Sequence, residues 1–188
     1  GLSGGMDSEK KTSFVNSLKG RGRKVTAEIT IPKEVLASVL RTTPELLRNS
    51  HGISSLAALL TGASNNAAHP ANGLAALYMA TGQDMANIGE ANQCSVYSYV
   101  TNKGDLYYSI TLPALIMATY GGGTGLSTQR ECLELMGCYG KDKAYKLIEI
   151  AAGLVVAGEL SLVSAARTDK ANGTNEWVDA HEKLGRNR

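Results

Sequence analysis

The sequence predicts an α+β fold in which one long central helix packs against a small antiparallel sheet. Residues 25–31 alternate apolar and polar side chains, as a strand with one buried face does. Residues 94–100 and 105–112 are two further strand-like segments, and the Thr-Asn-Lys-Gly turn between them is typical of a hairpin. Residues 143–167 are apolar and rich in Ala and Gly, which predicts a long helix with a closely packed backbone.

Shorter helices are predicted in the first half of the chain. Residues 12–20 have a helical pattern, and Pro32 ends the first strand and begins a helix that reaches Leu40. Residues 43–45, Thr-Pro-Glu, combine a capping hydroxyl, a proline at the first helical position and an acidic first turn, so they predict another helix start. Residues 52–60 are predicted to be helical and carry small side chains.

The second half adds two helix starts and a glycine loop. Pro70 begins a helix after a polar turn, and residues 119–125, Thr-Tyr-Gly-Gly-Gly-Thr-Gly, need the backbone freedom of glycine. Thr128 and Glu131 have the spacing of a capping box before a helix. Residues 172–186 carry a turn and then a short amphipathic tail.

Composition limits the class of protein. The 188 residues fit one domain, without an internal repeat or a linker, and suffice to bury a core without disulfides or a structural metal. Hydrophobic residues make up 43% and charged residues 19%, which argues against a disordered tail and a membrane protein. The formal net charge of +2 is too balanced for a protein whose main partner is nucleic acid.

The cysteines and the apolar stretches predict a reducing intracellular compartment. The three cysteines cannot all pair with one another, and none has the Cys-x-x-Cys spacing or the His neighbours of a zinc site, so we expect no metal. The first residues lack the basic-then-apolar order of a secretory signal. The longest strongly apolar stretch, residues 150–158, is too short to cross a bilayer, so a membrane anchor, if there is one, is expected outside this chain.

Three polar groups are candidates for chemistry, and each has an ordinary structural alternative. Lys10 and Lys11, in a glycine-rich segment, either hold an anion or a carbonyl oxygen or are exposed surface lysines. Asp84 is either the N-cap of a short turn or a buried acid beside a cation. His181 is either a functional group or a solvated tail histidine.

Two segments have the backbone features of ligand sites. The triple glycine at 121–123 either lets a backbone approach a pyrophosphate or forms a tight turn. His69 and Asn72 lie at a predicted helix start, where ligands often bind, although simple capping also explains the Asn. Taken singly, none of these features decides a function.

The order of the motifs is more specific than any one of them. Essentially the whole chain is covered, in order, by SGGMDSEKK, GRGRKVTAEITIP, VLRTTPELL, AAHPAN, GQDMAN, TYGGGTG, AGELSL and AHEKLGR. In this combination the chain resembles the 3-hydroxy-3-methylglutaryl-coenzyme A (HMG-CoA) reductases. The residues of its motifs are closer to those of the NADPH-using class I branch than to those of the bacterial degradative branch. The resemblance implies a partial large, substrate-binding domain of that fold.

The resemblance also implies what lies outside this chain. In the family, the large domain begins earlier and supplies a catalytic glutamate, and a small NADP-binding domain is inserted just before the SGG segment. Residues 1–188 are therefore expected to be the C-terminal part of the catalytic large domain. The family reduces the HMG-CoA thioester with two NADPH to give mevalonate and free CoA.

Three residues match the family's catalytic positions. Lys10 matches the lysine that faces the thioester carbonyl, where it would stabilise the developing oxyanion. Asp84 matches the buried aspartate beside that lysine, which keeps the ammonium charged within one coupled titration. His181 matches the tail histidine that protonates the departing CoA thiolate, a task suited to a pKa near neutrality.

The resemblance also implies binding positions. The HMG group is expected at Ser3, Gly5 and Lys11, CoA at Arg41, His69, Asn72, Ser161 and Leu162, and the cofactor at Gly121, Gly122 and Gly123. The family commonly has Asn at the position of Gly5 and Asp at the position of Glu9. Arg41 replaces a more usual lysine, which keeps a positive charge for a phosphate of CoA and changes the geometry of the contact. The family's further substrate lysine has no match, so either His51 or Arg48 replaces it or the substrate acid is held differently.

Two hypotheses of different class follow from the resemblance. The first is an NADPH-dependent reductase, a homodimer or homotetramer that builds each active site from two subunits. The second is a non-catalytic fragment that folds, oligomerises and binds CoA without turnover. The absent glutamate and cofactor domain favour the second for this chain alone, whereas Lys10, Asp84 and His181 favour catalysis for the parent enzyme.

Overall fold

The computed structural model describes residues 13–166, and their secondary structure confirms the α+β class. The strands are β1 (Arg23–Ile31), β2 (Ser95–Val100) and β3 (Leu106–Leu115). The α-helices are α1 (Phe14–Leu18), α2 (Lys33–Val35), α3 (Pro44–Thr61), α4 (Pro70–Thr81), α5 (Ile88–Ala91), α6 (Ser127–Leu135) and α7 (Ala144–Ala166). The short 3-10 and π-helical turns are η2 (Leu36–Leu40), η3 (Met85–Asn87) and η4 (Gly122–Gly125). The predicted turn and tail at 172–186 lie outside these residues.

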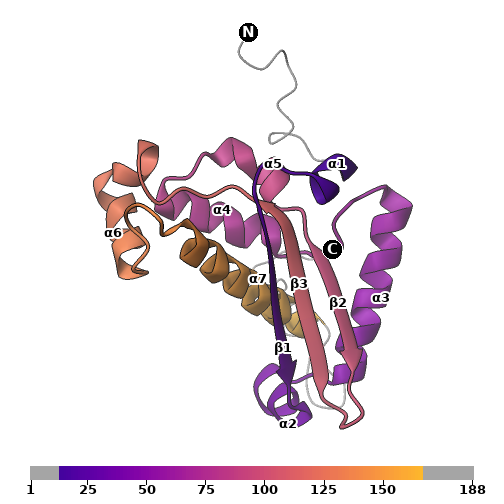
Figure 1. The fold of residues 1–188 in the computed structure, drawn as a ribbon. Coiled ribbons are helices and arrows are strands. Elements are labelled where there is room, and N and C mark those ends of the chain that lie inside the picture. Colours follow the sequence, from indigo (N-terminus) through magenta and orange to yellow (C-terminus); the bar gives the residue numbers. More distant parts are fainter. Residues whose placement is uncertain (1–12, 167–188) are drawn as a thin grey trace, which may run out of the picture.

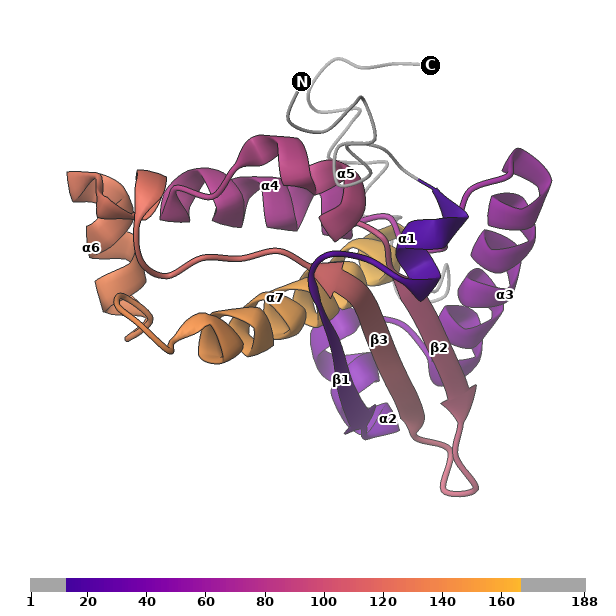
Figure 2. The same ribbon diagram turned by 45° about the horizontal axis from the view of Figure 1, so that its top comes forward.

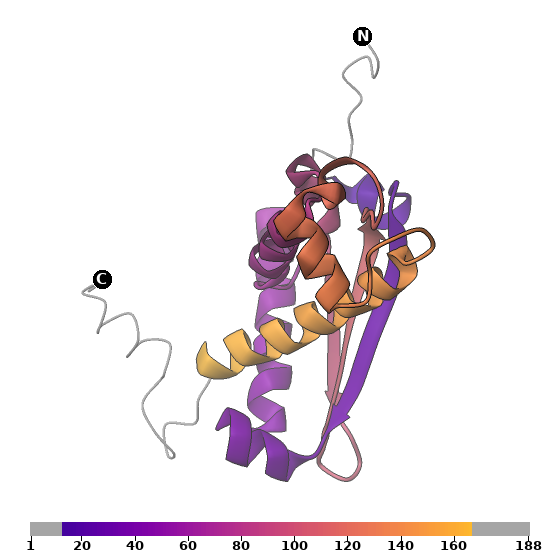
Figure 3. The same ribbon diagram turned by 90° about the vertical axis from the view of Figure 1, so that its left-hand side faces the viewer.

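The sheet is antiparallel and has β3 at its centre, in the order β1-β3-β2 (Figure 1). Along β3 the buried side chains of Leu106, Tyr108 and Ile110 alternate with the partly exposed Tyr107 and Ser109. Only one face of the sheet is therefore apolar, as the alternating pattern predicts. Figure 3 shows the long helices on one side of the sheet, so residues 13–166 form a helical layer packed on a sheet layer.

Helix α7 is the centre of the core. It crosses the covered face of the sheet and lies beside α4 (Figures 1 and 2). Its buried apolar side chains are small or branched: Leu147, Ile148, Ala151, Ala152, Val155, Val156 and Leu160. By length and composition α7 could cross a bilayer, but half of its most apolar window is buried against the other elements, as in the core helix of a globular domain.

The structure differs from the prediction in two of the helices of the first half of the chain. The segments expected at 43–45 and 52–60 form one continuous helix, α3, whose N-cap hydroxyl of Thr43 accepts a hydrogen bond from the Leu46 N–H at 3.3 Å. The helix expected between Pro32 and Leu40 begins as α2 and then widens into the π-helical turn η2.

The capping box predicted for α6 is wrong. The helix begins at Ser127 with Leu126 at the N-cap, no side chain caps it, and Thr128 lies inside the first turn. The Leu126 N–H donates to the Gly123 carbonyl at 3.2 Å, and the Leu126 carbonyl accepts from the Arg130 N–H at 2.8 Å. The turn η4 therefore runs directly into the helix, and Leu126 takes the N-cap position without a side-chain cap.

Acid is expected to destabilise this fold through His51, a residue of α3 whose ring faces the sheet. Its side chain is 5% exposed, its Nδ1 lies 2.6 Å from the Ser98 hydroxyl, and its ring centroid lies 4.9 Å from that of Tyr108. Burial lowers the pKa of His51 from 6.5 to about 4. The unfolded state therefore binds the proton first, so the stabilisation is complete above pH 6.5 and is lost as the pH falls toward 4.

Over that window the free energy of unfolding should fall by up to about 3 kcal/mol. Urea denaturation at a series of pH values measures it. The variant His51→Gln has no proton to bind and should show a much flatter profile. An unchanged slope in that variant would assign the acid sensitivity to other groups.

Candidate active site

The structure describes some of the predicted site residues and not others. Described are Arg41, His69, Asn72, Asp84, Gly121, Gly122, Gly123, Ser161 and Leu162. Outside the described residues lie Ser3, Gly5, Lys10, Lys11 and His181. The described geometry of the site is therefore that of α4, α7 and the glycine loop.

Helix α4 carries a predicted group at each of its ends. His69 is its N-cap residue, and Asp84 follows its C-terminal end as the N-cap residue of η3. The helix has 12 residues, so these ends are about 18 Å apart. Each end is docked onto a different partner segment.

At the C-terminal end, Asp84 acts as a cap. Its Oδ1 accepts a hydrogen bond from the Ala86 N–H at 3.0 Å, and its side chain is exposed in the described part of the chain. Of the two alternatives for Asp84, the structure confirms the N-cap. The burial implied by the resemblance is not found in residues 13–166, where the side chain of Asp84 is exposed.

The turn that carries Asp84 is docked onto the glycine loop. The side-chain amide of Gln83 pairs with the backbone of Ala118: Nε2 donates to the Ala118 carbonyl at 2.8 Å, and the Ala118 N–H donates to Oε1 at 2.6 Å. Gly82 has a left-handed backbone (φ 68°), and a Cβ placed on it would overlap the Gly123 carbonyl. The structure thus brings together the predicted catalytic aspartate and the predicted cofactor loop.

Replacing Gly82 by Ala should disrupt this contact. Gly62 provides a matched control, because it also ends a helix with a left-handed backbone (φ 69°) but has nothing within 4 Å of a built Cβ. Gly62→Ala should cost about 1 kcal/mol of unfolding free energy from backbone strain alone. Gly82→Ala should cost at least about 2 kcal/mol more, since its Cβ also meets backbone. Equal losses in urea denaturation would contradict the contact.

Of the three glycines at 121–123, two are uncovered and Gly123 is packed. Gly121 (φ 83°) and Gly122 (φ 56°) are exposed, and a Cβ at either would meet nothing within 4 Å. The Thr124 hydroxyl donates to the Gly121 carbonyl at 2.6 Å and so fixes the turn. A left-handed, uncovered backbone of this kind fits the approach of a phosphate-bearing cofactor.

At the N-terminal end of α4, the turn that carries His69 is docked onto α7. The buried carboxylate of Glu159 accepts hydrogen bonds from the N–H groups of Ala68, at 3.0 Å, and His69, at 2.6 Å. Ser161 and Leu162 follow Glu159 on the same helix. The structure therefore docks the turn that carries His69 onto the helix that carries these two predicted CoA residues. The sequence reasoning missed Glu159, although it is the one charged residue between positions 150 and 166 of this apolar helix, which is a signal for it.

The remaining predicted binding residues are exposed. Asn72 makes no cap for α4, so capping does not explain it. Arg41 (φ 52°) ends η2, which packs against α7. Of the two residues that are candidate replacements for the missing substrate lysine, His51 is buried and Arg48 is exposed, and both line a hollow of about 220 Å³.

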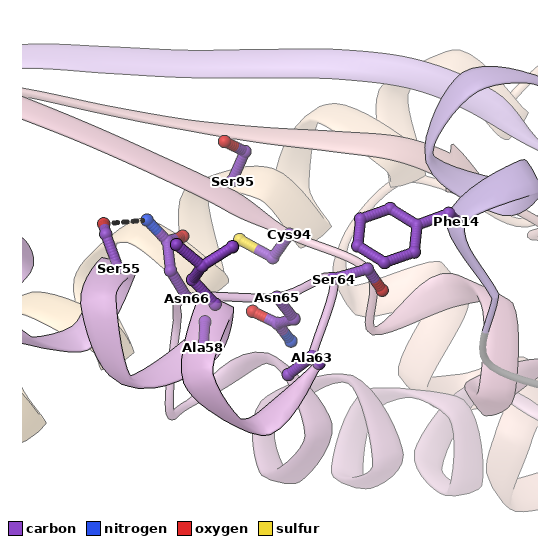
Figure 4. Close-up of a pocket in the computed structure, with 11 residues that line it drawn as sticks. Phe14, Ser55, Ala58, Ala63, Ser64, Asn65, Asn66, Cys94 and Ser95 are labelled. Carbon is purple, nitrogen blue, oxygen red and sulfur yellow. Dashed lines mark hydrogen bonds between the residues drawn. The ribbon is translucent and has the colours of Figure 1, made fainter.

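A separate hollow of about 250 Å³ lies between the C-terminal half of α3, the loop that follows it and the start of β2 (Figure 4). Asn66 donates to the Ser55 hydroxyl at 2.9 Å along its wall, and Phe14 and Cys94 also line it. Burial, and secondarily the charge of Glu159, raise the pKa of the Cys94 thiol, so it is unsuited to act as a nucleophile. No predicted site residue lines this hollow.

The motif order and the two docked segments agree with the comparison with known proteins. The family model described as Hydroxymethylglutaryl-coenzyme A reductase matches residues 1–186, and the chain belongs to this family. The 3-hydroxy-3-methylglutaryl-coenzyme A reductase of Methanothermobacter thermautotrophicus is 42% identical over 186 residues, covering 98% of this chain and 45% of the relative.

Two further relatives have the same name. That of Pyrococcus abyssi is 41% identical over 191 residues, which is 98% of this chain and 45% of the relative. That of Drosophila melanogaster is 39% identical over 174 residues, which is 87% of this chain and 19% of the relative. The chain thus spans less than half the length of the curated relatives that it matches.

Proposed function

We propose that this chain forms part of the active site of an enzyme that reduces HMG-CoA to mevalonate and free CoA with NADPH. The observation that carries the proposal is the docking of family motifs in pairs at the two ends of α4. The motif with Asp84 contacts the glycine loop, and the motif with His69 contacts the helix that carries Ser161 and Leu162.

The proposed catalytic roles are distributed over three residues. The Lys10 ammonium stabilises negative charge on the carbonyl oxygen of the thioester and later of the aldehyde. Asp84 keeps that ammonium charged, and the exposure of its carboxylate in residues 13–166 leaves room for Lys10 beside it. His181 gives a proton to the CoA sulfur when the carbon–sulfur bond breaks.

The proposed binding roles follow the two ends of α4. When bound, NADPH supplies the hydride for both reductions, and the uncovered backbone of Gly121 and Gly122 would hold its phosphate-bearing part. Arg41, His69, Asn72, Ser161 and Leu162 would contact CoA. Ser3, Gly5 and Lys11 would hold the HMG group.

NADPH oxidation tests this proposal in a full-length reductase that contains this sequence. HMG-CoA should drive oxidation of two NADPH per CoA released, and NADH should be a poorer substrate. The 188-residue chain alone should bind CoA without turnover. CoA binding without any reduction by the full-length protein would instead support the rival hypothesis, a non-catalytic CoA-binding module.

The proposed enzyme is a homodimer or a dimer of dimers. Within residues 13–166, one side of α3 exposes Ile53 (57%), Leu56 (56%), Leu59 (76%) and Leu60 (77%). An apolar helix face of this kind favours association. Light scattering of the full-length protein in dilute solution should therefore give twice or four times the subunit mass, and a monomer alone would contradict the prediction.

We also propose a reducing compartment for the protein. Cys94, Cys132 and Cys138 are free, and Cys94 and Cys138 are buried. Thiols of this kind persist where the environment keeps them reduced.

A further inference from the structure

Glu159 is a buried carboxylate in the most apolar helix of the structure. Its side chain is 2% exposed, and no Lys or Arg of residues 13–166 pairs with it. Its oxygens accept hydrogen bonds from two successive N–H groups, those of Ala68 and His69. These groups lie at the N-terminal end of α4, where the helix dipole also favours a negative charge. The carboxylate therefore ties together two segments that are 90 residues apart in the sequence.

The residue before Glu159 makes room for the His69 ring. A Cβ added to Gly158 would overlap the ring, and a Cβ added to Gly73 on α4 would do the same. The ring Nδ1 is buried and has no hydrogen-bond partner in the described part of the chain. The place of the ring is therefore set by the backbone bonds from Glu159 and by the two glycines, and not by a hydrogen bond at Nδ1.

We propose that Glu159 is a positioning residue that holds His69 in place for CoA. The proposal rests on the proposed function, because the CoA contact of His69 comes from there. Glu159 is buried and acts through the His69 backbone. Holding the turn in one conformation before CoA arrives reduces the ordering that binding would otherwise require. Loss of this hold should therefore weaken CoA binding and leave the hydride transfer steps largely unchanged.

The first test displaces the ring and keeps the carboxylate. In the full-length reductase, Gly158→Ala should raise the Kd for CoA, measured by calorimetry with CoA itself, and the KM for HMG-CoA by about tenfold, with kcat within about twofold. Gly153→Ala is the matched control on the same helix, because its Cβ would meet nothing within 4 Å. The control should bind CoA as the unsubstituted protein does.

The second test changes the carboxylate and keeps its size. Glu159→Gln removes the charge and one of the two acceptor oxygens, and its NH2 group cannot accept from an N–H donor, so CoA binding should again weaken by about tenfold. Glu149→Gln is the control, since Glu149 lies exposed on the same helix. His69→Ala should also weaken CoA binding. Adding Glu159→Gln to His69→Ala should weaken it by no more than about a further twofold, because both changes act through the same ring.

The outcomes separate this inference from the proposed function. An unsubstituted full-length protein that neither binds CoA nor reduces HMG-CoA would contradict the proposed function. Normal reduction with unchanged CoA binding in Gly158→Ala and Glu159→Gln would overturn only the role of Glu159. The role of Glu159 would also be overturned if the losses of CoA affinity from Glu159→Gln and His69→Ala multiplied in full in the double variant. It would likewise be overturned if Gly158→Ala and Glu159→Gln lowered the thermal stability and left KM unchanged. If one of Gly158→Ala and Glu159→Gln does not fold, CoA binding by the other variant tests the role of Glu159.

Discussion

Lys10→Ala should lower kcat by about a hundredfold or more in the full-length reductase while HMG-CoA still binds. The physical reason is that the lysine ammonium is proposed to face the oxygen on which charge grows as the hydride arrives. Its interaction is stronger in the transition state than in the ground state, so its loss should appear in turnover. Steady-state kinetics of NADPH oxidation measure the effect.

The neighbouring lysine gives the sharpest comparison. Lys11 is proposed to hold the HMG group, so Lys11→Ala should raise KM more than it lowers kcat. Lys24→Ala, at an exposed position of β1, should change neither. Lys10→Ala should also slow the reduction of supplied mevaldehyde, because that step develops charge on a carbonyl oxygen too. Turnover at the unsubstituted rate would remove Lys10 from the mechanism.

Local patterns predicted most of the fold. The alternation at residues 25–31 and the hairpin between β2 and β3 depend on neighbours in sequence, and both are confirmed. The boundaries of α3 and α6 depend on more than local pattern. Gly52 suggests an interruption, yet it lies within α3 with nothing near it, so the helix simply continues. The start of α6 is set by the backbone bonds of η4, which no side-chain pattern announces.

The candidate site was predicted as a set of motifs, without their arrangement. The pairing of the Gln83 amide with Ala118 joins residues 35 positions apart, and the bonds of Glu159 join residues 90 apart. Contacts between residues so far apart in the sequence follow from the packing of α4 against α7 and the glycine loop. The sequence pattern does not predict that packing. The local pattern left a cap and a buried acid open for Asp84, and its exposed place at the N-cap of η3 follows from the packing and not from neighbouring residues.

The two docked pairs have a common physical design. In each, one side chain with oxygen acceptors, Gln83 or Glu159, bonds the backbone of a distant segment, and a glycine beside it allows close approach. Backbone contacts of this kind fix a turn without occupying the side chains that carry chemistry. The side chains of Asp84 and His69 are therefore not used to hold these segments together, and they remain available for the proposed interactions with Lys10 and CoA.

His181→Gln should slow the overall reduction of HMG-CoA by about a hundredfold and leave the reduction of mevaldehyde largely intact. The proposed proton from His181 goes to the CoA thiolate, whose thiol pKa is about 8.5 if it resembles cysteine. Without that proton, the thiolate would attack the mevaldehyde intermediate again and return it to the thioester level. No thiolate departs when mevaldehyde is the substrate, so the proton is not needed there.

The two half-reactions thus separate His181 from Lys10, whose loss should damage both. Glu182→Gln, a change at the next residue, serves as the control and should affect neither reaction. A tail histidine that enters only when the thiolate leaves also predicts a slower release of CoA in the variant, measurable by trapping the free thiol. If mevaldehyde reduction falls as far as the full reaction in His181→Gln, the general-acid role is wrong. His181 would then be a substrate-binding or structural residue, and the tail would act as a cover for the site.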